Sequence, residues 1–294
     1  MASQGQTIKN AISVDVEDYY HVAALSKVIA RDQWHTMESR VERSTQRLLD
    51  LFGSRGVKCT FFVLGMVAEH KPQLVKEISQ RGHEVACHGY SHQLIYTQKQ
   101  QVFRDETLRA KGMLEDIVQV PVIGYRAASY SITQNSLWAL DILAEAGFTY
   151  DSSIFPVRHD RYGIPNAEEQ PHILKTPSGY SLAEFPLSIC KIFRYNLPVA
   201  GGGYFRLFPY ALTKYAFGRL NGSGKSAVFY LHPWEVDPDQ PRFNPSLLSK
   251  FRHYNNLDKC EQRLTRLISD FQFTTLRDVL KGLELLPAAQ SAAA

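Results

Sequence analysis

The sequence lacks any apolar run long enough to cross a membrane, and its first ten residues, MASQGQTIKN, contain no apolar stretch at all. A membrane-spanning helix needs about 20 consecutive, mostly apolar residues. A secretory signal needs an apolar core of about 7–15 residues. We therefore expect no transmembrane segment and no signal peptide. The expected location is the cytoplasm, with peripheral association with the inner membrane left open.

The sequence also lacks cysteines at the spacing of a zinc ribbon. The four cysteines, Cys59, Cys87, Cys190 and Cys260, stand far apart, and none belongs to a CxxC pair. Cys59 and Cys87 lie within apolar, strand-like runs, which predicts buried thiols. Buried free thiols favour a reducing compartment.

Dense runs of basic residues are absent as well. The chain has 33 Lys and Arg against 29 Asp and Glu, a net charge of +4 that is spread along 294 residues. This pattern argues against binding to nucleic acid. No internal repeat or interdomain linker is visible, so we expect one domain over residues 11–286. Residues 1–10 and 287–294 are expected to be disordered, and residues 157–222, rich in Pro, Gly and aromatics, to form an irregular insertion.

Short apolar runs alternate with segments of helical periodicity. Strands are expected at 11–16, 59–65, 83–88, 148–153 and 226–234, with a further strand at 271–275. Helices are expected at 39–53, 72–81, 98–118, 134–146 and 258–270, and one more at the end. In the helix 98–118 the inward side chains are expected to be Val102, Leu108, Met113 and Leu114. This alternation predicts an α/β fold with a parallel sheet.

Carboxylates and imidazoles follow two of these strands. Asp15, Glu17 and Asp18 end the first strand, where mutual repulsion would be relieved by a cation; the alternative is a solvated acidic turn. His88 and His92 follow the third strand, four residues apart. Two imidazoles and a carboxylate make a three-ligand metal site with a position left open for water. A structural histidine pair is the alternative.

Three further polar residues stand at strand ends. Arg126, in GYRAAS, can hold a carboxylate ionised, or form a surface ion pair. Asp151, in YDSS, can take part in the chemistry or cap a turn. His232, in YLHPWE, can be a general acid, or a packed structural side chain.

Together these motifs resemble a known family. SVDVED, TFFVLG, GHEVACHGYSH, GYRAAS, YDSS and FYLHPWE are similar to the successive motifs of the polysaccharide deacetylases, carbohydrate esterase family four with the NodB-homology domain. The resemblance covers roughly residues 11–235. It implies a distorted (β/α) barrel with about seven parallel strands. HPWEVDP and the aromatic, Gly-rich insertion resemble the subgroup found in exosortase-associated exopolysaccharide gene clusters.

The resemblance also implies roles for the site residues. Asp15 is expected to be the general base, with Arg126 orienting it, and His232 the general acid, with Asp151 tuning it. The metal ligands are expected to include His88 and His92. A backbone N–H near Ser129 is expected to bind the oxyanion, and Tyr130 and Trp234 to contact substrate.

The first motif departs from the family pattern. Most members have two adjacent aspartates, of which the second binds metal, whereas Val16 follows Asp15 here. Relatives with an Asp-Val-Asp pattern place the ligand two residues on, at Glu17, and strand alternation puts Asp15 and Glu17 on one side. Asp18 stays possible if the strand breaks early, although Glu17 is favoured.

The expected reaction is removal of N-acetyl groups from an acetylated polysaccharide or oligosaccharide. The expected cofactor is a divalent metal, zinc first, with cobalt, manganese or nickel as alternatives. Two other functions fit the same residues: a metal-dependent hydrolase of a small cyclic amide or imide, and a non-catalytic glycan-binding relative. The sequence leaves the oligomeric state open.

Overall fold

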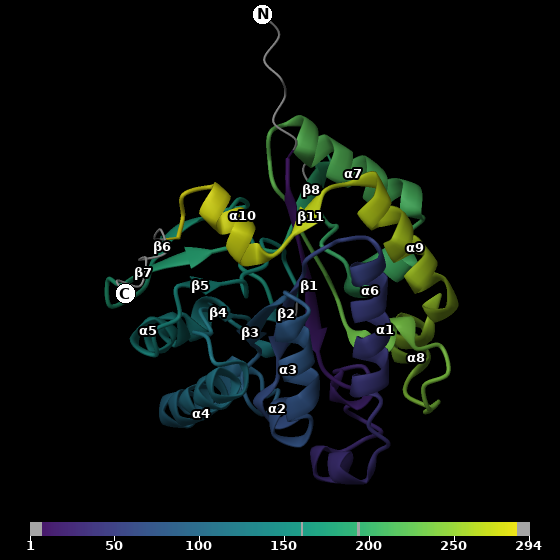
Figure 1. Ribbon diagram of the computed structural model, residues 1–294, viewed down its shortest axis with the longest axis horizontal. Coiled ribbons are helices and arrows are strands. Elements are labelled where there is room, and N and C mark those ends of the chain that lie inside the picture. The colour runs from purple at the N-terminus through teal and green to yellow at the C-terminus, as the bar shows by residue number, and fades with distance from the viewer. Residues whose placement is uncertain (1–7, 160, 193–194, 287–294) are drawn as a thin grey trace, which may run out of the picture.

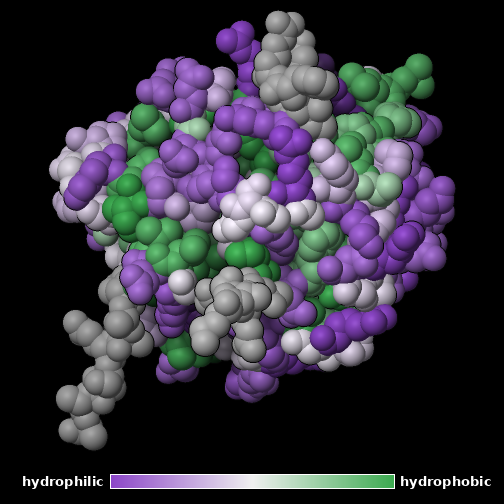
Figure 2. All heavy atoms as spheres, turned by 90° about the horizontal axis from the view of Figure 1, so that it is seen from above, coloured by the Kyte–Doolittle hydropathy of each residue, from purple (hydrophilic) through white to green (hydrophobic). Residues whose placement is uncertain are grey.

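The computed structural model describes residues 8–159, 161–192 and 195–286. Most of the segments expected to be disordered, residues 1–7 and 287–294, lie outside these ranges. None of the helices in the described ranges combines the length and apolar character that a bilayer-spanning helix needs. Seen from above, the surface is mostly hydrophilic, and its hydrophobic side chains gather in separate patches (Figure 2).

The centre of the molecule is a curled, mostly parallel sheet (Figure 1). Its strands follow the order β10-β1-β2-β3-β4-β5-β7-β6, and β11 pairs with β1 beside this path. Every pairing is parallel except that of β6 with β7. The strands are β1 (Asn10–Val16), β2 (Thr60–Val63), β3 (Glu84–Cys87), β4 (Gly124–Tyr125), β5 (Tyr150–Asp151), β6 (His172–Lys175), β7 (Ser181–Glu184), β10 (Val228–Leu231) and β11 (Phe273–Thr274). The expected distorted α/β barrel is confirmed as a half-barrel.

Helices connect the parallel strands, as βαβ crossovers require. In Figure 1 the helices of the first half lie side by side along β1 to β5. They are α1 (Val41–Ser54), α2 (Gly65–His70), α3 (Pro72–Gln80), α4 (Gln100–Val118) and α5 (Trp138–Glu145). The second half adds α6 (Gly202–Leu207), α7 (Tyr210–Gly222), α8 (Leu247–Tyr254), α9 (Leu257–Asp270) and α10 (Leu276–Gly282).

Residues 157–222, for which irregular structure was expected, contain ordered elements. They include β6, β7, α6, α7 and a separate antiparallel pair, β8 (Ile189–Ile192) and β9 (Tyr195–Pro198). These strands are only four residues long, and Gly and Pro stand between them. Such short runs carry too few residues for a periodicity to be read from sequence.

The inward face predicted for α4 is partly wrong. Val102 is 43% exposed and Leu108 is 48% exposed. The buried stripe instead consists of Phe103, Thr107, Ala110 and Leu114, at spacings of four, three and four. Phe103 sets this stripe, because its large ring packs against Tyr125 and Trp138. Residues one position away from a stripe are turned by about 100°, toward solvent.

Alternation along the strands separates two faces of the sheet. Ile12, Val14 and Val16 of β1 join the large core between the sheet and its helices. Ala11 of β1 and Phe62 of β2 belong to a second cluster, on the opposite, concave face. Successive strand residues point to opposite faces, so Ser13, Asp15 and Glu17 are directed to the concave side. Cys59 and Cys87 are buried free thiols, as predicted.

Candidate active site

Four expected site residues stand at or just beyond the carboxyl ends of four strands. His88 follows β3, Arg126 follows β4 and His232 follows β10, each directly after the last strand residue, and Asp15 is the last but one residue of β1. The preceding residues, Cys87, Tyr125 and Leu231, belong to the outer core. Alternation therefore directs all four side chains to the concave face, at the carboxyl edge where parallel α/β sheets bind their ligands.

Glu17, His88 and His92 form a buried cluster that can hold a metal ion. One ligand atom from each residue lies within 4.8 Å of the other two. His88 Nδ1 lies 2.8 Å from the carbonyl oxygen of Arg126, which assigns its proton to Nδ1 and leaves Nε2 to bind metal. Burial lowers the pKa of His88 to about 4, so its imidazole is neutral, as a ligand must be.

Glu17 offers the cluster a carboxylate oxygen that could bind a cation. Its Oε2 is buried and accepts no hydrogen bond from the described residues, although it lies 2.6 Å from Nε2 of His92. Burial raises the pKa of this carboxyl, but the imidazoles of His92 and His232 outweigh it and hold the pKa well below its usual value. An ionised carboxylate beside two imidazoles is a donor set that suits zinc and similar divalent ions.

Asp18 stands outside this cluster and has its own partners. Oδ1 accepts a hydrogen bond from the backbone N–H of Arg40 at 2.8 Å. Oδ2 accepts one from Ser39 Oγ at 2.7 Å and one from the hydroxyl of Tyr20 at 3.1 Å. Burial raises the pKa of this carboxyl to about 6. Asp18 therefore anchors the loop after β1, and the geometry favours Glu17 as the carboxylate of the cluster.

Asp15 lies beside the cluster in a buried ion pair. Arg126 Nη1 donates to its Oδ1 at 2.8 Å, and the hydroxyl of Tyr130 lies 3.3 Å from its Oδ2. Ser13 and Ser152 hold the other donors of Arg126: Nη1 lies 2.7 Å from Ser13 Oγ, and Nη2 lies 2.9 Å from Ser152 Oγ. A guanidinium fixed in this way keeps a carboxylate both ionised and oriented.

His232 follows β10, the strand that pairs with β1, and lies beside Glu17 of the cluster. Its Nε2 is 3.5 Å from Oε1 of Glu17, and its Nδ1 is 2.9 Å from Oε1 of Glu235. Burial lowers the pKa of His232, but the carboxylates of Glu17 and Glu235 outweigh it and raise the pKa to about 9. Trp234 stacks on the imidazole, with ring centroids 5.1 Å apart. His232 is thus held as a charged donor beside the pocket.

Asp151 does not contact His232, against the expectation that it tunes the general acid. Its Oδ1 accepts from Ser153 Oγ at 2.6 Å, and its carboxyl hydrogen-bonds to that of Glu184. Burial raises the pKa of both carboxyls, so this pair shares a proton away from the pocket. The carboxylate that contacts His232 is instead that of Glu235, three residues further on.

The three expected substrate contacts all line the pocket above the cluster, which measures about 250 Å³. Ser129 and Tyr130 have φ angles of 52° and 53°, a left-handed backbone that non-glycine residues adopt at a cost of about 1–3 kcal/mol, often at functional sites. The N–H of Tyr130 donates to the carbonyl of Ala127. Trp234 is only 6% exposed, so its indole packs on the ring of His232 and has little contact with solvent.

Sequence reasoning missed three residues around this site. Glu235 is one, although it lies in the same HPWE motif as His232. Arg206 is the second. It is fully buried, and its Nε donates to Glu235 Oε2 at 2.6 Å. It belongs to none of the motifs recognised in the sequence. His21 is the third. Its Nδ1 accepts from the N–H of Asp18, its ring stacks on His92 at 5.9 Å, and its Nε2 is buried without a hydrogen-bond partner among the described residues.

Two family models divide the chain between them. Residues 30–150 match the polysaccharide deacetylase family, and residues 152–281 match a domain of unknown function, DUF3473. The first range contains His88, His92 and Arg126. The second contains His232, together with Arg206 and Glu235 that hold it.

Curated relatives match about a third of the chain. A peptidoglycan-N-acetylglucosamine deacetylase of Bacillus cereus is 31% identical over 98 residues, 33% of this chain and 36% of the relative. A peptidoglycan deacetylase of Helicobacter pylori is 32% identical over 110 residues, 37% of this chain and 36% of the relative. A chitooligosaccharide deacetylase of Bradyrhizobium is 29% identical over 100 residues, 34% of this chain and 43% of the relative. The matches thus span less than half of each relative.

Solved structures share the fold over nearly the whole chain. A crystal structure from Mycobacterium smegmatis, assigned to the polysaccharide deacetylases, has a TM-score of 0.63 at 21% identity and covers 100% of this chain and 97% of its own. Puue allantoinase has a TM-score of 0.62 at 16% identity, with 95% and 91% covered. At these identities the likeness establishes the architecture alone.

Proposed function

We propose that this chain is a hydrolase that removes N-acetyl groups from amino sugars of a polysaccharide or oligosaccharide. The match to the polysaccharide deacetylase family and the curated deacetylases that it resembles support this proposal. One observation carries the proposal. Two carboxylate-based pairs, Asp15 with Arg126 and His232 with Glu235, adjoin the cluster of Glu17, His88 and His92 in one pocket.

A divalent metal fits this cluster. Glu17 Oε2 lies 2.6 Å from His92 Nε2, and a cation beside these two atoms and the imidazole of His88 would meet three suitable donors. Glu17, His88 and His92 would hold the ion. When bound, it would supply Lewis-acid polarisation of the acetyl carbonyl and a lowered pKa of water. We propose zinc, with cobalt, manganese and nickel as alternatives.

Asp15 is suited to act as the general base. Arg126 binds its Oδ1, and the carboxylate lines the pocket, which leaves Oδ2 to accept a proton from the attacking water. The hydroxyl of Tyr130, 3.3 Å from Oδ2, restricts the rotation of the carboxylate. A bidentate or doubly held carboxylate is a base of fixed direction, which lowers the entropy lost on reaching the transition state.

His232 is suited to act as the general acid. Its Nδ1 is held by Glu235 and its ring is packed on Trp234, so Nε2 points to the cluster side of the pocket. From there the imidazolium would give its proton to the nitrogen of the leaving amino sugar. The backbone N–H of Ser129, on the pocket wall, is the proposed oxyanion donor. The products would be acetate and a free amino sugar.

Acetate release tests this function. The protein is loaded with zinc and incubated with N-acetylated chitooligosaccharides and, in parallel, with allantoin, the substrate of the cyclic-amide rival. Wild-type protein is expected to release acetate and to leave allantoin intact. Asp15→Asn with bound metal is expected to release none above background. Ring opening of allantoin without acetate release would favour the cyclic amide hydrolase. Oligosaccharide binding with neither reaction would favour a non-catalytic relative.

We also propose that the chain belongs to the exosortase-associated subgroup and has a role in exopolysaccharide synthesis, on the basis of its sequence motifs. The DUF3473 match over residues 152–281 supports a distinct subgroup, because it covers the half of the chain that the deacetylase model leaves out.

A further inference from the structure

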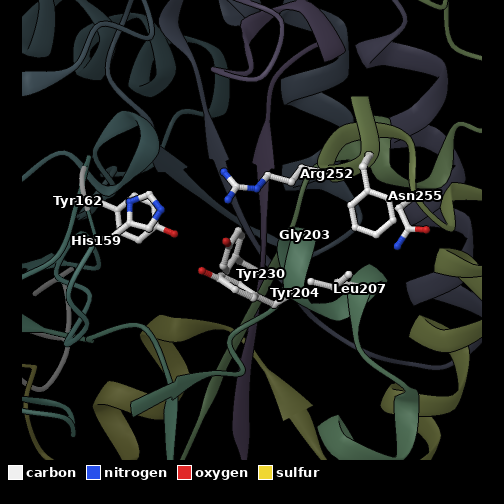
Figure 3. A pocket seen from close by; sticks show the side chains of 9 residues that line it. His159, Tyr162, Gly203, Tyr204, Leu207, Tyr230, Arg252 and Asn255 are labelled. Atoms are coloured by element: carbon white, nitrogen blue, oxygen red, sulfur yellow. The ribbon is translucent and has the colours of Figure 1, made fainter. Parts of the chain in front are cut away.

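A second pocket opens beside the catalytic one. It measures about 280 Å³ and is lined by residues of the second half of the chain, among them Tyr162, Tyr204, Arg252 and Asn255. Figure 3 shows the guanidinium of Arg252 pointing across this pocket, above the hydroxyl of Tyr230 and toward the rings of Tyr162 and His159. The pocket lies in the region matched by DUF3473.

The two pockets are continuous. Tyr162, Gly203, Tyr230 and Arg252 line both of them. Each pocket lies slightly below the usual range of small-molecule sites, about 300–1,000 Å³. A ligand that fills both is therefore longer than a single sugar ring, as a polysaccharide is. The second pocket is then the place of the ring next to the one that carries the acetyl group.

Arg252 gives this pocket a charge. Its side chain is exposed, and no salt bridge joins it to a carboxylate of the described residues. Arg126 and Arg206, in contrast, are buried and paired with Asp15 and Glu235. Among the described residues the lining of the second pocket contains no aspartate or glutamate. A guanidinium fork facing an open cavity without a counter-charge is complementary to an oxyanion of the ligand.

The rest of the pocket suits a sugar ring. Tyr162 hydrogen-bonds to Tyr204, and its ring stacks on Phe155 at a centroid distance of 5.6 Å, which fixes an aromatic wall. Arg252 lies close enough to Tyr162 to influence the pKa of its hydroxyl. Aromatic walls with a few oriented polar groups are typical of sites that bind rigid, partly apolar ligands.

We propose that this pocket binds the sugar next to the one that is deacetylated, and that Arg252 binds a carboxylate or phosphate carried by that sugar. The inference rests on the proposed function, since it names the chemical class of its substrate: an acidic rather than a neutral acetylated polysaccharide. A uronic acid and a sugar phosphate each present two oxyanion oxygens that a guanidinium can bind with two parallel hydrogen bonds.

Equilibrium binding at low ionic strength tests the proposal without turnover. The probes are a hyaluronan tetrasaccharide, which carries carboxylates beside its N-acetylated rings, N,N′-diacetylchitobiosyl phosphate, and neutral tetra-N-acetylchitotetraose (called chitotetraose below). Wild-type protein is expected to bind at least one anionic probe about tenfold or more tighter than chitotetraose, and to lose this preference at high salt. The probe that is preferred identifies carboxylate or phosphate. Equal Kd values for all three probes would overturn the proposal.

Two variants of α8 separate a specific contact from general attraction. Arg252→Gln removes the guanidinium. The preference of this variant for the anionic probe, measured as the ratio of the two Kd values, is expected to fall about tenfold. Lys250→Gln removes one positive charge from the same helix, but Lys250 lines neither pocket and bonds to Asn244. Lys250→Gln is expected to keep the preference. Equal losses in the two variants would show that only the net charge of the surface matters.

Gly203 allows a steric test of the same pocket. A Cβ added there would meet no atom within 4 Å, so a larger side chain can enter the cavity without disturbing the protein. Gly203→Leu is expected to weaken the binding of every probe about tenfold. The control is Gly218→Leu on α7, where the space is equally open and no described pocket is lined. Unchanged binding in a folded Gly203→Leu protein would exclude this location.

Acetate release by the same proteins keeps the two claims apart. Preferential binding of an anionic probe with no acetate from any probe would refute the deacetylase function and leave the anion subsite standing. Acetate release with equal Kd values would do the reverse. Thermal unfolding of each variant verifies that the protein is folded before its Kd is compared.

Discussion

The candidate site has a base side, around Asp15, and an acid side, around His232. The two sides share one kind of ion pair, but different structural elements carry it. On each side a carboxylate is held by a buried arginine: Asp15 by Arg126 at 2.8 Å, and Glu235 by Arg206 at 2.6 Å. Arg126 follows a strand, and its partners Ser13 and Ser152 belong to or follow strands of the same sheet. Register alone therefore brings the base side together.

The acid side is assembled from loops and short helices. Arg206 belongs to α6, and its Nη1 donates to the backbone carbonyls of His253 and Asn255 at the end of α8, at 2.8 and 2.9 Å. One side chain thus ties α6 to α8 and orients Glu235 as well. The sheet thus positions the proposed base and the proposed metal ligands, whereas the second half of the chain contributes the proposed acid and the residues that hold it.

Glu17 is shared by both sides, so its replacement has the largest expected effect. Glu17→Gln should lose metal and lower acetate release by at least about 10³-fold, because a bound metal contributes several kcal/mol and each 1.36 kcal/mol is a factor of ten. Asp18→Asn is the matched control, one residue away. Metal content by atomic absorption and acetate release are measured together. If Asp18→Asn loses the metal and Glu17→Gln retains it, the assignment of the ligand is reversed.

His232 tests whether the two sides are chemically distinct. His232→Gln should retain the metal and lower kcat about 10²–10⁴-fold, the usual contribution of a general acid. His88→Gln, on the sheet side, should lose the metal instead. Metal titration of both variants, alongside kcat, provides the readout. Loss of metal in His232→Gln would place this imidazole among the ligands and remove the distinction.

The base side could be predicted from sequence because the features that indicate its residues lie within single strands. Apolar strand runs end directly before His88 and Arg126, and parallel strands present their carboxyl ends at one edge. The two-residue alternation that favoured Glu17 over Asp18 also depends only on β1. Such features require no knowledge of how distant segments pack.

The acid side could be predicted only in part, since its contacts are distant in sequence. His232 follows a strand and was found, but Glu235 and Arg206 are 29 positions apart and meet only through the packing of α6. Asp151 shows the opposite error: it follows a strand as the others do, but Glu184 on the neighbouring β7 draws its carboxyl away from the pocket. The end of a strand predicts where a residue lies, but the hydrogen-bond partners of its side chain determine what that side chain can do.

Glu235→Gln is expected to have an intermediate effect. It keeps the shape of the side chain but removes the charge that holds His232, so kcat should fall about 10–100-fold, as is usual for groups that orient a functional residue. KM should change little, and the pH dependence of kcat should shift because the imidazole loses a stabilising carboxylate. Glu235→Asp should recover part of kcat. A fall in activity without any shift of the pH profile would indicate loss of structure alone.

Glu235→Gln also leaves Arg206 buried with a weaker partner. Removing one member of a buried ion pair costs about 3–5 kcal/mol of the free energy of unfolding. Kinetics are therefore measured at a temperature where denaturant unfolding shows both proteins to be fully folded. The corresponding cost on the sheet side should be similar in size, since both arginines are fully buried.

The smallest expected effects concern the hydroxyls that hold Arg126. Ser152→Ala leaves Nη2 without the partner that lies 2.9 Å away, whereas Ser13→Ala leaves Nη1 with Asp15 still 2.8 Å away. An unsatisfied buried donor costs about 1–3 kcal/mol, and an ordinary hydrogen bond about 1 kcal/mol. Ser152→Ala should therefore lower the free energy of unfolding more than Ser13→Ala, with only a few-fold loss of kcat in either. The opposite order in urea denaturation would mean that Ser13, not Ser152, fixes the guanidinium, and that β1 rather than β5 anchors the base side.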